Sequence, residues 1–404
     1  MRYALLSLLC AVAVIAYVQR MALSLSTKDI QADLRIDEGA MGLIMGCWFW
    51  GYALLQIPAG WVTDRIGSKR SLVVFVALWS ALTGTAALAG GFYQLLFLWS
   101  LVGLAQTGLV PGAAKAIGTW FPPTGRAFAS GLFAASMALG SAVAPLVSAW
   151  LLLRYDWQQL LRIYMIPGLL WVAVFALVVP DRRDTAPQSG WFAATIVRMA
   201  TSLPMQLLCL QQFLRAAAMV FFFTWFPRFL QETWQVSQFE SGQLAWWPGI
   251  GAMFGGISGG IVSDWLLKVT GRRRISRQGV AVFGTLLCAG LALFATYSAD
   301  VTVAVLLLSA AAFWGFFAGV SGYSVCLDVS GRRVGTVISV MNTCGNVGGG
   351  VFPIVIGWLV SRTGNWDFVL PLFAAMFVAD AICWALMNPK RPLFEDDEFR
   401  ETRS

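Results

Sequence analysis

The chain has 404 residues, of which 58% are hydrophobic and only 12% are charged, and it carries a formal net charge of +8. A soluble protein of this size has no way to bury so much apolar surface, because cores stop growing once a chain divides into domains, so the composition excludes a soluble class and indicates a membrane protein. The sequence contains no His, the commonest metal ligand and general base, and its seven Cys are irregularly spaced in hydrophobic segments, so we expect no metal site, no cofactor and no enzyme activity.

Hydrophobic segments long enough to cross a bilayer follow one another along almost the whole chain. A helix needs about 20 apolar residues to cross the hydrocarbon core. Such segments occupy residues 3–24, 39–62, 71–89, 92–119, 126–152, 161–180, 202–230, 237–264, 276–297, 300–325, 334–360 and 366–387. We therefore predict an all-α membrane protein with twelve transmembrane helices.

The first of these segments has the features of a signal peptide. Arg2 precedes an apolar run that extends to Tyr17, and small residues follow near Ala22. We nevertheless expect an uncleaved first helix, because its Arg20 fits a place in the working interior of the protein.

The charged residues of the loops are distributed unevenly between the two sides of the bilayer. Some loops are basic, as at Arg65, Lys69 and Arg70, whereas loops on the other side are acidic, as at Asp33 and Asp37. This asymmetry is the positive-inside signature, and it predicts a multi-pass protein of the cytoplasmic (inner) membrane with both termini in the cytoplasm. It also accounts for the net positive charge without a nucleic-acid partner.

A polar interval in the middle of the chain separates six hydrophobic segments from six others. We interpret residues 1–180 as an N-terminal six-helix bundle, 181–200 as a cytoplasmic central loop, 201–389 as a C-terminal six-helix bundle and 390–404 as a cytoplasmic tail.

The two halves share a short motif. Gly60-x-x-x-Asp64-Arg65 follows the second segment, and Gly260-x-x-x-Asp264-Trp265 follows the eighth, about 200 residues later. The chain is therefore interpreted as a duplicated six-helix unit, a recurring transporter design in which the substrate site lies between the repeats.

The complete first motif, Gly60-x-x-x-Asp64-Arg65-x-Gly67-x-Lys69-Arg70, resembles the loop between helices 2 and 3 of the major facilitator superfamily. The resemblance implies the fold of that family, two pseudo-symmetric six-helix bundles, and a cytoplasmic latch that biases the open states. The gating residues that it implies are Asp64, Arg65 and Lys69, with Lys115 and Arg126 at the ends of the fourth and fifth helices, and Asp264 and Arg272 in the second half.

Shorter matches spread over nearly the whole chain resemble the anion:cation symporter branch of that superfamily. They are Tyr17-Val-Gln-Arg20, Phe49-Trp-Gly-Tyr52-Ala-Leu-Leu-Gln-Ile-Pro58, Thr119-Trp-Phe-Pro-Pro, Thr224-Trp-Phe-Pro227 and Asn342-Thr-Cys-Gly-Asn346. The branch includes permeases for sugar acids and other organic anions, so the resemblance implies a small anionic substrate.

Arg20 is the foremost candidate for binding that anion. A charge inside the membrane is costly and indicates a functional site, and the planar guanidinium fork matches a carboxylate or phosphate. The alternative is an arginine that extends to the nearby membrane interface. Tyr17 and Tyr52 match family positions that line the cavity, where a phenol group can donate to a bound acid.

Four polar residues of the second half are weaker candidates for the substrate site. Arg215 in the seventh segment would pair with Arg20 as arginines do in organophosphate:phosphate antiporters, although those transporters carry theirs about one turn nearer the Trp-x-Pro motif. The others are Tyr323, Asn342 and Asn346, for which packing and helix–helix hydrogen bonds are the alternative role.

The acids that carry protons in this branch are missing from their usual positions. Gln19 and Gln106 stand there instead, so Gln106 is expected to contact substrate without exchanging a proton, and family-style proton symport does not follow. Asp380 is the only acid deep in a segment, and we expect a structural or interfacial role for it in the twelfth helix.

We therefore predict a secondary transporter for a small organic anion, a carboxylate such as a sugar acid, that works by alternating access as a monomer in the lipid bilayer. The sequence does not identify its coupling ion. A phosphate or organophosphate antiporter that uses Arg20 and Arg215 is the alternative, and a non-transporting membrane sensor is the alternative of another class.

Overall fold

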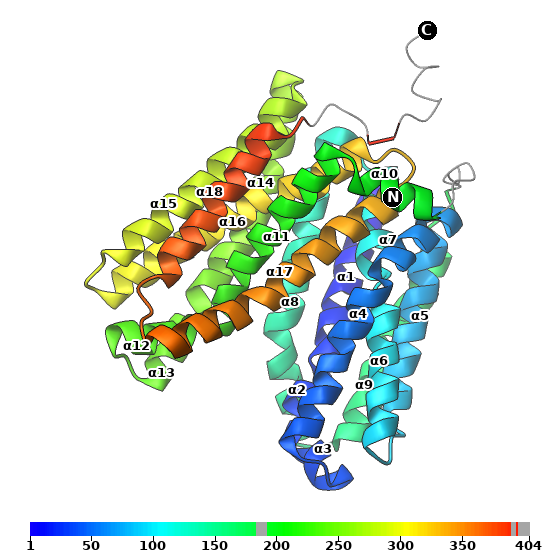
Figure 1. Ribbon diagram of the computed structural model, residues 1–404. Coiled ribbons are helices and arrows are strands. Elements are labelled where there is room, and N and C mark those ends of the chain that lie inside the picture. Colours follow the sequence, from blue (N-terminus) through cyan, green and yellow to red (C-terminus); the bar gives the residue numbers. More distant parts are fainter. Residues whose placement is uncertain (183–191, 389–392, 395–404) are drawn as a thin grey trace. The chain divides into compact units, whose positions relative to one another are not determined.

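The computed structural model describes residues 1–182, 192–388 and 393–394, and the described chain is almost entirely helical, with no strand (Figure 1). This confirms the all-α prediction. The long helices are α1 (Arg2–Arg20), α4 (Glu38–Ile66), α5 (Ser68–Ala86), α6 (Phe92–Gln106), α7 (Leu109–Trp120), α8 (Arg126–Leu152), α9 (Trp157–Val178), α11 (Leu203–Thr224), α14 (Trp246–Thr270), α15 (Val280–Thr296), α16 (Val301–Val329), α17 (Val334–Thr363) and α18 (Val369–Leu386). The short ones are α2 (Ala22–Leu25), α3 (Thr27–Leu34), η1 (Pro123–Gly125), α10 (Phe192–Ala200), α12 (Phe226–Trp234), α13 (Gln238–Leu244) and the π-helical turn η2 (Arg274–Gly279).

Eleven stretches of the described chain are long and apolar enough to cross a membrane. The predicted segment 71–89 is not among them, because α5, which forms it, begins with Lys69 and Arg70 and these lower its mean hydropathy. With 19 residues and a rise of about 1.5 Å per residue, α5 is still long enough to reach across most of a hydrocarbon core of about 30 Å.

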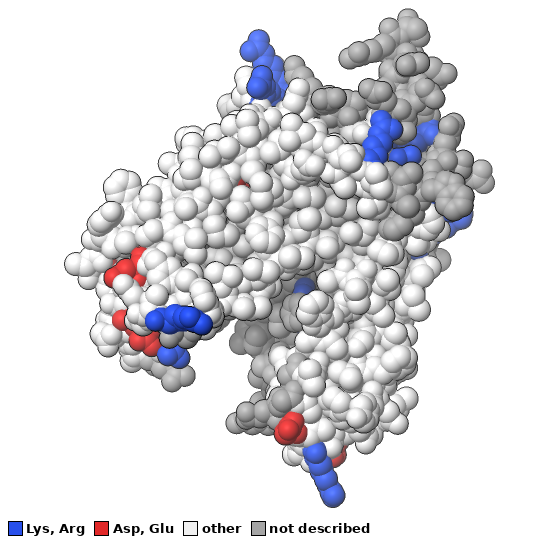
Figure 2. All heavy atoms as spheres, viewed as in Figure 1, with Lys and Arg blue, Asp and Glu red and all other residues white. Residues whose placement is uncertain are grey.

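The surface supports a lipid environment. Across most of the face in Figure 2, the described residues show no charged side chain, and Lys, Arg, Asp and Glu gather in a few groups. Large apolar side chains are exposed in the middle of long helices, for example Leu54 at 72%, Phe97 at 63% and Phe254 at 56%. Exposed apolar patches of this kind are unfavourable in water and favourable against lipid tails.

Several predicted segments are not single helices; among them, 92–119 is divided between α6 and α7, and 237–264 between α13 and α14. The first segment ends its regular helix at Arg20, and α2 and α3 continue after a break at Met21. The seventh is divided at Trp225, where α12 begins with a Pro in its first turn, a position at which Pro is well tolerated. In the segment assigned to the central loop, Phe192–Ala200 forms α10, whereas residues 183–191 lie outside the described chain, as does most of the tail predicted at 390–404.

The chain forms two compact units. Unit 1 contains Met1–Trp120, the described part of Phe133–Ser189 and Arg332–Ser339, and unit 2 contains the remaining described residues. In unit 1 α4 packs along α6 and α5 along α9, and in unit 2 α14 packs along α16 and α15 along α18. The first turns of α8 therefore belong to unit 2, and those of α17 belong to unit 1.

The repeat predicted from the motif is visible in the backbone. Arg35 and Gln235, 200 residues apart, both end a short helix in the left-handed conformation. Asp37 and Ser237 then cap the next helix by accepting a backbone N–H three residues on. The same sequence of helix, left-handed residue and capped helix therefore occurs once in each unit.

The close packing of α4 and α14 depends on glycine at equivalent positions. A Cβ atom on Gly51 would lie 2.7 Å from the carbonyl oxygen of Ser100 in α6, and a Cβ atom on Gly251 would collide with the carbonyl of Ser309 in α16. Small residues let helix backbones approach closely, so these glycines fix the α4–α6 and α14–α16 contacts.

Candidate functional site

Arg20 lies in an aromatic box formed by α1 and α4 in unit 1. Its guanidinium carbon is 3.8 Å from the ring centroid of Trp48, 5.4 Å from that of Tyr17 and 5.6 Å from that of Tyr52. Trp48 and Tyr52 stack with centroids 5.0 Å apart and an interplanar angle of 14°, and the Tyr52 hydroxyl accepts a hydrogen bond of 3.3 Å from Gln56 Nε2.

Helix geometry explains the box. Tyr17 precedes Arg20 by three residues on α1, and Trp48 precedes Tyr52 by four on α4, so each pair shares one helix face. Arg20 is the last residue of α1, where the helix dipole favours a cation. A guanidinium carbon 3.8 Å from the ring centroid of Trp48 lies within cation–π range, and a guanidinium group is suited to bind a planar carboxylate.

Gln19 connects α1 to two other helices of unit 1. Its side chain is buried, its Nε2 donates to the Tyr164 carbonyl at 2.6 Å, and its Oε1 accepts from Trp79 Nε1 at 2.7 Å. Gln106 is also buried and donates to the Ala16 carbonyl of α1 at 3.4 Å. Each amide therefore donates to a backbone carbonyl, which a carboxylate cannot do.

Arg215 lies in unit 2, whereas Arg20 lies in unit 1. Its side chain is 9% exposed, and its Nη2 donates to Gln212 Oε1 at 2.7 Å. A Cβ atom on Gly319 of α16 would lie 2.8 Å from Arg215 Nη1, so this glycine makes room for the guanidinium. Tyr323 donates to Asn342 Oδ1 at 3.3 Å, whereas Asn346 is exposed.

Asp64 forms the centre of a buried cluster in unit 1, which we call latch 1. It accepts from the backbone N–H groups of Gly335 at 2.8 Å and Thr336 at 2.7 Å, and from the Thr336 hydroxyl at 2.7 Å. Lys115 Nζ lies 3.3 Å from Asp64 Oδ1 and donates to the Asp64 carbonyl at 2.9 Å. Latch 1 therefore places a carboxylate at the N-terminus of α17, where the helix dipole and the free N–H groups favour a negative charge.

Three other cations predicted for the gate have different surroundings. Arg65 stacks on Trp61, with its guanidinium carbon 3.9 Å from the ring centroid. Lys69 donates to the Ala176 carbonyl at 2.8 Å. Arg272, expected beside Asp264, is exposed.

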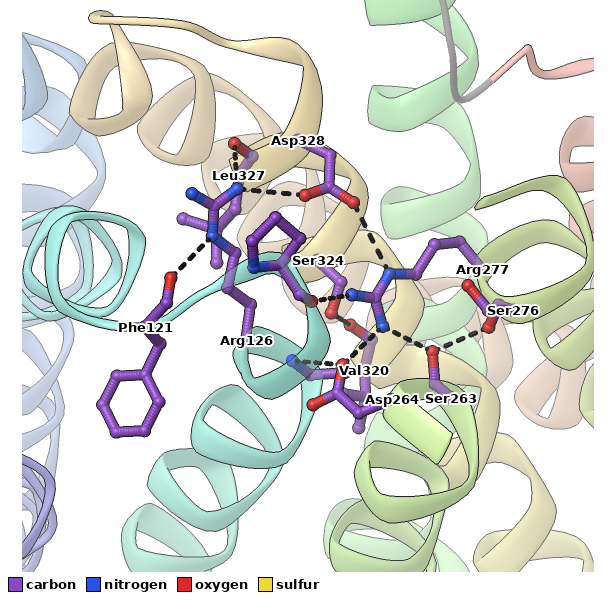
Figure 3. Close-up of polar contacts among 12 residues, drawn as sticks. Phe121, Arg126, Ser263, Asp264, Ser276, Arg277, Val320, Ser324, Leu327 and Asp328 are labelled. Atoms are coloured by element: carbon purple, nitrogen blue, oxygen red, sulfur yellow. Dashed lines mark hydrogen bonds and ion pairs between the residues drawn. The ribbon is translucent and has the colours of Figure 1, made fainter. Parts of the chain in front are cut away.

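Asp264 is the counterpart of Asp64 in unit 2 and forms the cluster that we call latch 2 (Figure 3). It accepts from the backbone N–H groups of Phe128 at 2.8 Å and Ala127 at 3.4 Å, which lie at the N-terminus of α8. Its cation is Arg277, whose Nη1 is 2.9 Å from Asp264 Oδ1 and whose Nη2 donates to the Pro123 carbonyl at 2.6 Å.

Latch 2 extends to a second acid. Asp328, whose side chain is fully buried, lies between two arginines: its Oδ1 is 3.1 Å from Arg126 Nη1, and its Oδ2 is 3.5 Å from Arg277 Nε. Arg126 also donates to the Leu327 carbonyl at 3.4 Å. The resulting chain Asp264–Arg277–Asp328–Arg126 contains two acids and two cations, so its buried charges compensate one another.

Sequence reasoning missed Trp48, Arg277 and Asp328. Trp48 lies one helix turn before Tyr52, and this spacing could have indicated that the two rings share one face of the helix. Arg277 is one of several cations in a basic loop; its position in the π-helical turn η2 is buried, whereas that of Arg274 in the same turn is exposed. Asp328 near the end of α16 had no motif to mark it.

The family model of the Major Facilitator Superfamily matches residues 9–353. Among curated proteins, the chain is similar to a probable sulfoacetate transporter of Cupriavidus necator, with 28% identity over 98% of this chain and 96% of that protein. It is similar to a hexuronate transporter of Bacillus subtilis, with 30% identity over 91% of both chains. It is also similar to a probable galactarate/D-glucarate transporter of Escherichia coli, with 28% identity over 91% of this chain and 89% of that one.

Among solved structures, the chain resembles the fucose:proton symporter of E. coli, with a TM-score of 0.76, 17% identity and coverage of 94% of this chain and 97% of that chain. At this identity the likeness shows the fold alone. It confirms the prediction of a twelve-helix fold of this type, with α5 as the helix that composition alone leaves out.

Proposed function

Because the chain belongs to the Major Facilitator Superfamily, we propose that it is a secondary transporter that moves a small organic anion, a carboxylate of the sugar-acid kind, across the cytoplasmic membrane. The observation that carries this proposal is the aromatic box around Arg20, a fixed positive charge held by three rings in unit 1. The curated relatives are named as transporters of sulfoacetate, hexuronate and galactarate/D-glucarate. All of these compounds are carboxylates.

Arg20 would hold the carboxylate by its N–H fork while the rings hold the guanidinium. Three stacked or nearby rings restrict the side chain before substrate arrives, which lowers the entropy lost on binding. Tyr17 and Tyr52 carry phenol groups next to the cation, and these can bind the hydroxyl groups of a sugar acid. The proposed path has further candidate contacts, of which Arg215 and Gln106 are buried and Tyr323 donates to Asn342; Asn346 is a further candidate.

Transport would proceed by alternating access between the halves 1–180 and 201–389, with latches 1 and 2 as gates. Each latch ties an acid of one half of the sequence to the first turn of a helix from the other half. Opening requires those buried N–H groups and carboxylates to separate and become hydrated. We propose that the protein works as a monomer with both termini in the cytoplasm.

Uptake by proteoliposomes tests the proposal. Purified protein would be offered labelled D-glucarate, D-glucuronate, D-galactonate and sulfoacetate, with Arg20→Ala as the test variant. Arg154→Ala is the matched control, because Arg154 also lies over a ring, 4.9 Å from the centroid of Trp150, but is exposed. We expect uptake of at least one acid, its loss in Arg20→Ala and its retention in Arg154→Ala.

Two results would contradict the proposal. One is uptake by Arg20→Ala that equals wild-type uptake. The other is exchange of labelled phosphate in counterflow without uptake of any acid, which would favour a phosphate antiporter instead.

A further inference from the structure

Asp380 on α18 is a buried acid without a hydrogen-bond partner. Its side chain is 0% exposed, and among the described residues no donor meets hydrogen-bond geometry at either carboxylate oxygen. Nearly all buried polar groups of native proteins are hydrogen-bonded, and an exception calls for an explanation. The structural or interfacial role expected from the sequence stays a prediction, and the missing hydrogen bonds call for a further explanation.

Among the described residues, Arg215 is the charged group that acts on Asp380. The groups that face it are Arg215 from α11, Cys288 from α15, and Cys383 and Trp384 from its own helix. α11 and α15 are the helices that pack most closely on α18. The indole of Trp384 and the guanidinium of Arg215 approach the carboxyl group but do not reach hydrogen-bond geometry, and Arg215 Nε is itself buried without a partner.

Such a site favours a carboxyl group in its neutral form. An ionised carboxylate buried without hydrogen bonds is strongly disfavoured, whereas a carboxylic acid loses far less on leaving water. A cation close by but not in contact has the opposite effect, because it attracts the ionised form. Two opposing effects therefore act on Asp380: burial without hydrogen bonds favours its neutral form, and the charge of Arg215 favours its ionised form.

We propose that Asp380 binds and releases a coupling proton and that Arg215 links this proton to the transported anion; this rests on the proposed function. With the proton bound, Asp380 is neutral, and the positive charge of Arg215 is available to attract an anion. With the proton released, the carboxylate competes with the anion for Arg215. Proton binding and anion binding then favour each other, and the linkage is reciprocal.

This assignment gives the chain a proton site in its second half. In the first half Gln19 and Gln106 each donate to a backbone carbonyl, and an amide cannot exchange a proton. Lys115 and Asp64, the buried ion pair of unit 1, are engaged in latch 1. Asp380 differs from all of these because both its oxygens are unengaged in the described structure.

Infrared spectroscopy tests proton binding without any substrate. Wild type, Asp380→Asn and Asp367→Asn would be reconstituted in lipid, and pH-difference spectra recorded in the carboxylic acid C=O region. Asp367 is an exposed acid and serves as the control. We expect a buried carboxylic acid band in wild type and Asp367→Asn that is absent from Asp380→Asn. Identical spectra for wild type and Asp380→Asn would overturn the proposal.

Transport measurements test the coupling. With an acid that wild type takes up from the panel above, we expect a pH gradient to drive accumulation by wild type and Asp367→Asn at least tenfold better than by Asp380→Asn. Counterflow of the same acid should persist in Asp380→Asn, which shows that the variant is folded and still binds substrate. Equal gradient-driven uptake by wild type and Asp380→Asn would overturn the proposal. Failure of wild type to take up any acid would contradict the proposed function instead, and the infrared result would then decide whether Asp380 binds a proton.

Discussion

Asp64 and Asp264 lie 200 residues apart and make the same contact in the two units. Each carboxylate accepts the backbone N–H groups of two successive residues at the start of a helix: Gly335 and Thr336 for Asp64, Ala127 and Phe128 for Asp264. Each also has one buried cation, Lys115 or Arg277. The duplicated motif therefore encodes an acid that caps a helix from the other half of the sequence.

Replacement of Asp64 by Asn should weaken latch 1. The amide presents an NH₂ group to N–H donors and removes the charge opposite Lys115, so we expect a lower melting temperature in detergent and a loss of about 1–3 kcal/mol of stability. Asp181→Asn is the control, because its ion pair with Arg70 is exposed on both sides and such pairs contribute about 0–1 kcal/mol. Equal melting temperatures for the two variants would contradict the role of Asp64.

Gly60→Ala should destabilise latch 1 by steric conflict. A Cβ atom there would collide with the Gly335 carbonyl, which belongs to the turn that Asp64 caps. Gly46→Ala in the same helix is the matched control, because its Cβ atom would meet nothing within 4 Å, and Ala is favoured over Gly within a helix by about 0.5–1 kcal/mol. We expect thermal unfolding to shift down for Gly60→Ala and to stay level or shift up for Gly46→Ala; a downward shift of both would show that the helix tolerates no added methyl group.

Arg277→Lys should disrupt latch 2, although it preserves the charge. The planar guanidinium reaches Asp264, Asp328 and the Pro123 carbonyl at once, and an ammonium group cannot reproduce that geometry. A buried acceptor left without its hydrogen bond costs about 1–3 kcal/mol, so we expect a clear loss of thermal stability and of uptake. Arg272→Lys, on the exposed residue, should behave as wild type, and a loss of the same size there would show that the effect is not specific to the contacts of Arg277.

Gln19→Glu should make the stability of the protein fall as pH rises. A protonated Glu can donate to the Tyr164 carbonyl as Gln does, whereas an ionised Glu places two acceptors 2.6 Å apart. We expect stability close to wild type at acidic pH that falls as pH rises, measured by thermal unfolding across pH. Gln94→Glu is the control, because its side chain only accepts, from the Gly90 N–H, and it is exposed. A flat pH profile for Gln19→Glu would contradict the donor role of Gln19.

The composition and the repeated motif were sufficient to predict the fold. Apolar segments of bilayer length predicted the helices, and the repeated Gly–x–x–x–Asp motif predicted the duplication that Arg35 and Gln235 show in the backbone. The breaks at Met21 and Trp225 were not predicted, because the apolar runs continue across them. A run of apolar residues long enough to cross a bilayer does not indicate where the helix is interrupted.

Fewer residues of the candidate site than of the fold could be predicted from the sequence. Arg20, Tyr17 and Tyr52 could be proposed because one helix turn separates the first two and a resemblance marked the third. The partner of Asp264 could not be chosen among several cations of one loop, since Arg277 differs from Arg272 only in the backbone turn that carries it. The missing hydrogen bonds of Asp380 are a property of its neighbours and leave no trace in the sequence.

The central claim is that Arg20 binds the carboxylate of the transported anion, and equilibrium binding measures it most directly. Isothermal titration of the purified protein with the acid that it transports would compare wild type, Arg20→Ala and the exposed control Arg154→Ala. Loss of a charge-assisted hydrogen bond costs about 1.5–3 kcal/mol, so we predict that Arg20→Ala weakens Kd by about tenfold or more while Arg154→Ala leaves it unchanged. An unchanged Kd in folded Arg20→Ala would contradict the account.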